Sequence, residues 1–133
     1  MKKWLVRALC CSVIAGAMTT PVQAADQDYR LVTVAGYLHF YLLNLNACED
    51  FHPSVRPAAF AAEQRLYPWL AKLEAKTKSS IDASVISDVV RKRRDALNVQ
   101  INEGDFTAEH CQAVIKLLDG NGLDQTLLKS LEE

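Results

Sequence analysis

Acidic and imidazole side chains gather beside two cysteines of this chain. They stand within four residues of Cys48 or Cys111: Glu49, Asp50, His52, Glu109 and His110. A carboxylate near a histidine can take up and return a proton, which is the basis of general acid–base catalysis. Solvated helix ends carry the same residue types, and an acid near a helix start complements the helix dipole. No serine or cysteine nucleophile arrangement and no oxyanion loop accompanies them, so we expect no catalytic site here.

The most distinctive polar feature is a run of four consecutive basic residues: Arg91, Lys92, Arg93 and Arg94. On a helix, four consecutive side chains spread around the axis instead of forming one stripe. Asp88 precedes Lys92 by four residues and Asp95 follows Arg91 by four, so we expect part of this charge to be balanced locally. The run is therefore either a solvated helix face or a docking surface for an acidic protein or an anionic lipid surface.

The first 24 residues have the features of a cleavable export signal. Two lysines and an arginine come before any acidic residue, and residues 5–18 form an apolar stretch too short to span a bilayer. Small residues precede Ala24, where we place the cleavage site. The remaining residues, 25–133, have the length of one domain, and we expect them to be periplasmic.

Cleavage would also change the charge of the protein. It removes three basic residues and no acidic one, which leaves 109 residues with 12 basic and 16 acidic side chains and a formal net charge of −4. A mildly acidic protein outside the cytoplasm is not expected to bind nucleic acid. No later apolar run approaches 18 residues without polar interruption, so we expect no transmembrane segment after cleavage.

Cys48 and Cys111 are the two cysteines that remain after cleavage. An even number of cysteines in a small exported domain predicts a disulfide. The alternative is a zinc site built from these cysteines with His52 and His110. Adjacent side chains such as His110 and Cys111 point about 100° apart on a helix, so that set converges poorly. We therefore expect the disulfide, and no metal or other cofactor.

Apolar residues recur at helical spacing in every long segment, and strand signals are poor. The first helix should run from about Gln27 to Asp50. Its apolar residues cover most of its circumference, so we expect it to be the central helix, buried by several neighbours or in a dimer. A second helix, capped by Ser54, should reach about Lys76 and bend or split near Pro68.

Three further helices complete the predicted fold. A third, capped by Ser79 or Ser80, should run to about Asn102, where Gly104 ends it. Its expected core face is apolar: Ile81, Val85, Ile86, Val89, Val90, Leu97 and Ile101. Thr107 should cap a fourth helix and Asp124 a short last one. The prediction is an all-α fold, a small bundle of four main helices plus a short C-terminal helix, with one disulfide.

The segment Cys48-Glu49-Asp50-Phe51 resembles the motif around the first cysteine of the HdeA acid-stress chaperones. Those proteins are also small, exported, helical and held by one disulfide, so the resemblance implies a chaperone that acts in acid. The match covers four of 109 residues, and a long aromatic helix precedes the motif here. The architecture is also similar to that of periplasmic immunity proteins against secreted peptidoglycan amidases, without a shared motif.

These features favour a binding protein over an enzyme. We expect an exported, periplasmic, non-enzymatic protein that binds another protein, as an inhibitor, immunity factor or chaperone. The candidate contact residues are the basic run and the polar end of the first helix: Arg91, Lys92, Arg93, Arg94, Glu49, Asp50 and His52. A homodimer, an acid-stress chaperone, and a small periplasmic hydrolase or ligand-binding enzyme using Glu49, His52 and His110 are kept as alternatives.

Overall fold

The computed structural model describes residues 29–132, and the account below concerns the unit that begins at Leu31. The expected export signal and the start of the first helix lie outside the described residues. Within the described part the chain forms helices and no strands, which confirms the all-α prediction.

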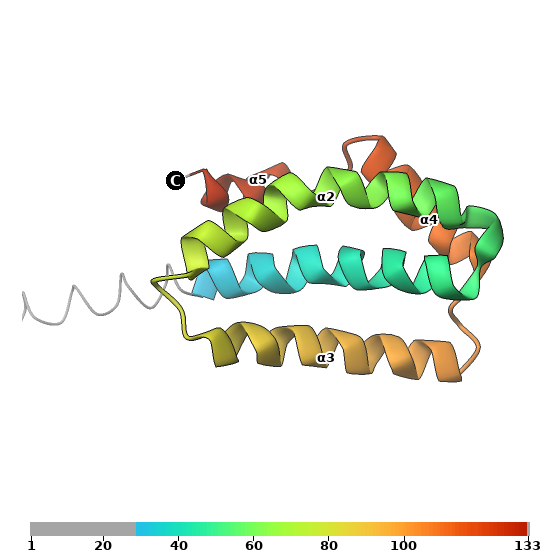
Figure 1. Ribbon diagram of the computed structural model, residues 1–133, viewed down its shortest axis with the longest axis horizontal. Helices are drawn as coiled ribbons and strands as arrows, with labels where there is room; N and C mark the ends of the chain where they lie inside the picture. The colour runs from blue at the N-terminus through green and yellow to red at the C-terminus, as the bar shows by residue number, and fades with distance from the viewer. Residues whose placement is uncertain (1–28, 133) are drawn as a thin grey trace, which may run out of the picture. The chain divides into compact units, whose positions relative to one another are not determined.

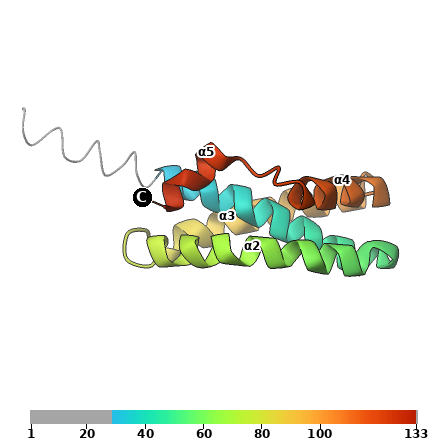
Figure 2. The same ribbon diagram turned by 90° about the horizontal axis from the view of Figure 1, so that it is seen from above.

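The first helix occupies Tyr29–Phe51. The elements that follow it in the chain are η1 (Pro53–Val55), α2 (Arg56–Thr77), α3 (Ala83–Asn102), α4 (Ala108–Asp119), α5 (Gln125–Leu128) and η2 (Lys129–Leu131). The first helix lies between α2 and α3 (Figure 1). In Figure 1, α4 and α5 lie on the same side of the first helix as α2, and α3 lies on the other side. The turned view in Figure 2 separates α2 from α4 and α5, and α4 packs against both α2 and the first helix. This arrangement confirms four main helices and a short C-terminal one.

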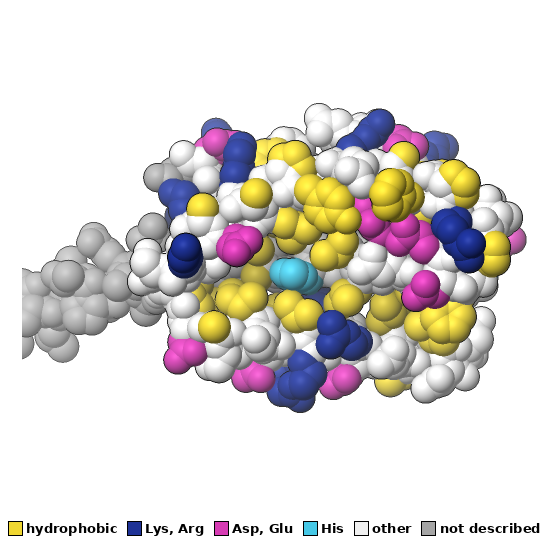
Figure 3. All heavy atoms as spheres, in the orientation of Figure 1, with side chains coloured by type: hydrophobic (Ala, Val, Ile, Leu, Met, Phe, Trp, Pro, Cys, Tyr) yellow, Lys and Arg dark blue, Asp and Glu magenta, His cyan; other side chains and the backbone are white. Residues whose placement is uncertain are grey.

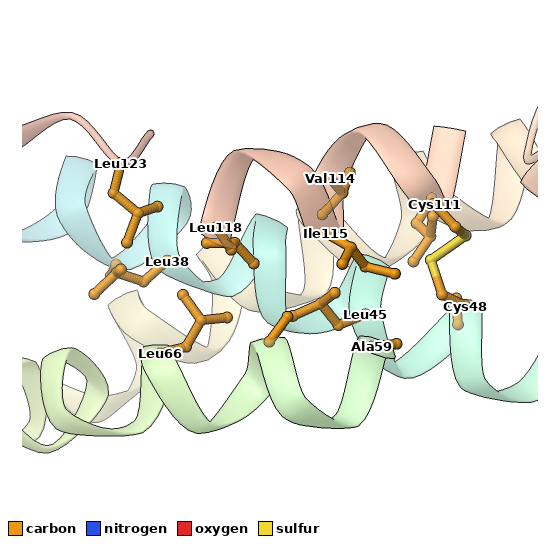
Figure 4. Packing of buried hydrophobic residues seen from close by; sticks show 14 of the residues in the cluster. Leu38, Leu45, Cys48, Ala59, Leu66, Cys111, Val114, Ile115, Leu118 and Leu123 are labelled. Carbon is orange, nitrogen blue, oxygen red and sulfur yellow. A yellow bond between two sulfur atoms is a disulfide. The ribbon is translucent and has the colours of Figure 1, made fainter. Parts of the chain in front are cut away.

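The core forms where the first helix meets α2 and α4. The buried stripe of the first helix follows the predicted spacing of three and four: Leu31, Val34, Leu38, Leu45 and Cys48. Figure 4 shows Leu38 and Leu45 between Leu66 of α2 and the α4 residues Ile115 and Leu118. Such close packing of aliphatic side chains from three helices is the main source of stability in a bundle of this kind.

The predicted disulfide between Cys48 and Cys111 is present. The two Cα atoms are 5.8 Å apart, both residues are fully buried, and 63 positions separate them in the chain. The bridge joins the last turn of the first helix to the first turn of α4. At the other end of α4, Arg65 of α2 forms an ion pair with Asp119 at 3.3 Å and donates a hydrogen bond to the Leu118 carbonyl at 2.9 Å.

Two of the predicted helix starts are wrong and two are confirmed. The backbone amide of Val55 donates a hydrogen bond to the His52 carbonyl. Ser54 therefore lies inside the short turn η1 and does not cap α2. The Ser80 hydroxyl donates back to the Lys76 carbonyl at 2.7 Å, and Asp82 caps α3 instead. Thr107 and Asp124 cap α4 and α5 as predicted.

Pro68 does not split α2. The helix is continuous from Arg56 to Thr77, and Figure 1 shows it curving over the first helix. Proline removes one backbone donor and crowds the preceding turn, which a long helix can accommodate by bending.

The predicted core face of α3 does face the bundle, but it is only partly buried. Of its seven expected residues Leu97 is buried, Val85 is 40% exposed, and the other five are half-buried: Ile81, Ile86, Val89, Val90 and Ile101. A side chain added at Gly36 of the first helix would come within 3.2 Å of Val89, so the two helices approach closely there. Helix α3 therefore rests on the first helix along one narrow edge, and its flanks stay open.

Candidate functional site

An open hollow lies between α2 and α3, with the first helix as its floor. We call it the α2–α3 groove, and its lining residues are His39, Leu70, Leu73, Glu74, Thr77 and Ile86. Its volume is about 270 Å³. Figure 3 shows a histidine at the bottom of a hollow bordered by hydrophobic side chains. Burial lowers the pKa of His39, so its imidazole is neutral at pH 7 and adds no charge to an apolar groove.

Two glutamates meet where the C-terminal end of the first helix packs against α2. Glu63 is only 4% exposed, although it is a charged residue on a helix surface. Its Oε2 accepts a hydrogen bond from the Tyr67 hydroxyl at 3.1 Å, while its Oε1 has no donor among the described residues unless a neighbouring carboxyl is protonated. Glu49 lies within hydrogen-bonding reach of Glu63. We call these residues the Glu49–Glu63 pair.

The environment of Glu49 favours its protonated form. Desolvation, followed by the hydrogen bond to Glu63 and the charges of Glu63 and Asp50, raises the pKa of Glu49 to about 7. Arg56 opposes this shift, and its Nε donates to the Glu49 carbonyl oxygen at 3.0 Å. Near neutral pH Glu49 is therefore close to half-protonated, and its charge changes with its surroundings.

Exposed aromatic side chains flank the pair on α2. Phe60 stands three residues before Glu63 and is 57% exposed, and Tyr67 stands four residues after it and is 45% exposed. Residues at these spacings are neighbours on one helix face. Figure 3 shows acidic side chains beside hydrophobic side chains of α2 on the face that contains the groove.

The polar corner expected near the disulfide is divided in the structure. The His52 Nε2 lies 2.9 Å from the Phe106 carbonyl oxygen, and the His110 Nε2 lies 2.7 Å from the Asn44 Oδ1. Both imidazoles also lie against the Phe106 ring, with centroids 5.6 and 5.4 Å away. These contacts cover the disulfide end of the core, whereas Glu49 belongs to the pair with Glu63. Asp50 is exposed beside Glu49.

The basic run on α3 is exposed but not uniform. Arg91 pairs with Asp88 at 3.2 Å, three residues away, and not with Asp95 as expected. Arg93 turns toward the first helix, where its guanidinium carbon lies 5.8 Å from the Phe40 ring centroid. It also lines a small hollow of about 80 Å³. Lys92 and Arg94 have no ion pair within the described part of the chain and point their charge to solvent.

The described residues were also compared with the requirements of a metal site and of a membrane-spanning helix. Between residues 29 and 132, no group of three or more histidine, cysteine, aspartate or glutamate side chains is placed to hold a metal ion. The first helix is long and apolar enough to cross a membrane, and half of its most apolar window is buried inside the structure. Core helices of soluble proteins and export signals have the same length and composition as membrane-spanning helices.

Comparison of the chain with protein-family models, with curated protein sequences and with solved structures finds no match. The α2–α3 groove and the burial of Glu63 were not predicted from the sequence. One signal for Glu63 was available, because it stands in a stripe of α2 whose spacing is four and three: Ala59, Glu63, Leu66, Leu70 and Leu73. A single acid in such a stripe indicates a buried carboxylate with a special neighbour.

Proposed function

We propose that this chain is an exported, periplasmic, non-enzymatic protein that binds another protein along the α2–α3 groove. The observation that carries the proposal is the groove itself, which is open, mostly apolar and about 270 Å³ in volume. Grooves between two helices commonly accept the apolar face of a partner helix. The partner class that fits this groove is a protein segment with large aliphatic or aromatic anchors.

The uneven covering of the first helix supports this proposal. On one side α4, α5 and the C-terminal turn bury it with a row of leucines: Leu118, Leu123, Leu128 and Leu131. On the other side α3 buries only Leu97, leaves Val85 exposed and keeps the groove residue Ile86 half-buried. Apolar surface that stays open in a monomer is typical of an interaction site.

The separation of the acidic and imidazole groups weighs against the enzyme alternative. Glu49 is paired with Glu63, while the Nε2 atoms of His52 and His110 are held by Phe106 and Asn44. A general acid and a general base must both reach the reacting atoms of one substrate. Here the carboxylate of Glu49 and the two imidazoles each contact a different neighbour and do not converge. The binding function requires no such convergence.

Site-directed photo-crosslinking in intact cells tests the proposal. A benzophenone amino acid replaces Glu74, which is exposed and lines the groove, or Gln112, an exposed residue of α4 that serves as the matched control. We expect a discrete heavier adduct from position 74 and none from position 112. Equal adducts from both positions, or none from either, would contradict the proposal.

A pair of substitutions on α3 sharpens that experiment. Ile86→Asp places a charge in the groove, whereas Val99→Asp places one at a residue that is already 54% exposed. The adduct should fall at least tenfold with Ile86→Asp and persist with Val99→Asp. Circular dichroism of both variants checks that the helices are retained.

A further inference from the structure

We infer that the Glu49–Glu63 pair, flanked by Phe60 and Tyr67, is a receptor for a lysine or arginine side chain of the protein partner. This inference deepens the proposed function and rests on it, because the cation would be delivered by the segment that occupies the groove. It assigns the polar part of recognition to residues that lie apart from the basic run on α3.

The first argument is the unsatisfied carboxylate oxygen of Glu63. A buried polar atom without a hydrogen-bond partner is costly, and a buried charge without a counterion is more costly still. The Oε1 of Glu63 can gain a donor from a protonated Glu49, but no cationic side chain occupies that place. An ammonium or guanidinium group would provide both donors and charge.

The second argument is the pair of aromatic rings beside the carboxylates. Phe60 and Tyr67 expose 57% and 45% of their surface on the two sides of Glu63 along α2. A cation is attracted to the face of an aromatic ring as well as to a carboxylate. Exposed rings on either side of a buried acid therefore form a site suited to a long cationic side chain, whose methylene groups would pack against the rings.

The third argument is the charge that surrounds the pair. Asp50 adds negative charge, while Arg56 is the cation that opposes the shift of Glu49. The Nε of Arg56 donates to the backbone oxygen of Glu49. This N–H group is therefore not available to the carboxylate oxygens of the pair. Binding of a partner's cation would favour the charged form of Glu49, which would then release its proton and strengthen the attraction.

The position of the pair also defines the spacing of the partner's contacts. Glu63 and Leu70 are seven residues apart on α2, and this spacing corresponds to about 10 Å along the axis and to nearly the same helix face. A helical partner would match it with a lysine or arginine seven residues from a large apolar anchor. Calcium fits less well, since it takes six to eight oxygen ligands and the pair supplies two carboxylates.

A titration followed by nuclear magnetic resonance tests the inference. The ¹⁵N-labelled, disulfide-bonded protein is titrated with N-acetyl-arginine methylamide at pH 7.5, and separately with the uncharged citrulline analogue. We expect saturable shifts at the amides of Phe60, Glu63 and Tyr67 with the arginine compound, with a Kd of roughly millimolar order for so small a ligand. Equal shifts with both compounds, or no shifts at these amides, would overturn the inference.

Matched variants assign the effect to the pair. Glu63→Gln and, independently, Glu49→Gln should weaken binding of the arginine compound at least fivefold, while Glu109→Gln, a change at an exposed acid of α4, should leave it unchanged. Equal weakening by all three changes would point to a general charge effect and contradict the site. Calcium chloride that shifts the same amides below 1 mM, an order-of-magnitude threshold for a weak extracellular site, would identify a metal site instead.

The outcomes separate the two proposals. A crosslink at position 74 without binding of the arginine compound would remove the cation receptor and leave groove binding intact. Binding of the arginine compound without any crosslink at position 74 would contradict the proposal that the partner binds in the α2–α3 groove.

Discussion

The two sides of the first helix are built in different ways. On the α4 side, the Cys48–Cys111 bridge, the Arg65–Asp119 ion pair and a continuous apolar core fix the neighbours in place. On the α3 side, one buried leucine, the half-buried Ile86 and Ile101, and the Arg93 contact with Phe40 hold a helix of 20 residues. This difference agrees with the proposal that a partner binds on the α3 side, because a face completely satisfied within the chain has little left to offer a partner.

The largest effect should come from removing the disulfide. Replacing Cys48 and Cys111 by alanine frees a loop of 63 residues in the unfolded chain and should lower the free energy of unfolding by about 4 kcal/mol. Urea unfolding of the two forms measures the change. A loss below about 1 kcal/mol would show that the α4 side does not depend on the bridge.

Aliphatic truncations should distinguish the closed side from the open one. Leu45→Ala removes a fully buried side chain and should cost about 3 kcal/mol, whereas Ile86→Ala removes a half-buried one at the groove and should cost about 1 kcal/mol. Both values come from chemical unfolding under the same conditions. Equal losses would contradict the view that α3 is loosely held.

The Glu49–Glu63 pair should give a pH dependence opposite to that of an acid-unfolding switch. The pKa of Glu49 is raised in the folded state to about 7 from its ordinary value of 4.5, so folding takes up a proton between these pH values. Its contribution to stability is fully present below about pH 4.5 and is lost as the pH rises through 7. We expect a loss of roughly 1 kcal/mol between pH 5 and 8, because partial exposure screens the interaction.

Thermal unfolding across that range measures the effect, with Glu49→Gln as the comparison. The glutamine variant should show a flatter dependence than the wild type, while Glu109→Gln should not change it. A wild-type stability that rises steadily from pH 5 to 8 would contradict the raised pKa of Glu49. This pair therefore gives no support to the acid-stress chaperone alternative, for which acid must weaken the fold.

The smallest expected effect separates two neighbours in the basic run. Arg93→Ala loses the contact with Phe40 and should cost about 0.5–1 kcal/mol, while Arg94→Ala changes an exposed side chain and should be neutral within about 0.5 kcal/mol. Denaturant midpoints of the two variants provide the test. Equal midpoints would show that Arg93 is solvated like its neighbour.

Much of the fold could be predicted because its signals are local. Helical periodicity identified the central helix, Thr107 and Asp124 begin helices where a capping side chain is expected, and two cysteines predicted one bridge. Ser54 and Ser80 show the limit of such signals. Ser54 lies inside a short turn closed by the bond from the Val55 amide to the His52 carbonyl, and the Ser80 hydroxyl donates to the Lys76 carbonyl.

The open face and the glutamate pair could not be predicted in the same way. Periodicity shows which face of α3 is apolar, but it does not show how many neighbours will cover that face, and only Leu97 became buried. Glu49 and Glu63 come from different helices, so their meeting depends on tertiary packing. The expected corner failed for the same reason, since His52 and His110 found partners in Phe106 and Asn44.

Hydrogen exchange of the captured complex tests most directly whether the open face is the binding face. The protein is compared alone and bound to the partner identified by crosslinking, with exchange followed along α2, α3 and α4. Binding at the α2–α3 groove predicts slower exchange around Leu70, Thr77 and Ile86 and unchanged exchange in α4. Slower exchange confined to α4, with α2 and α3 unchanged, would contradict the account.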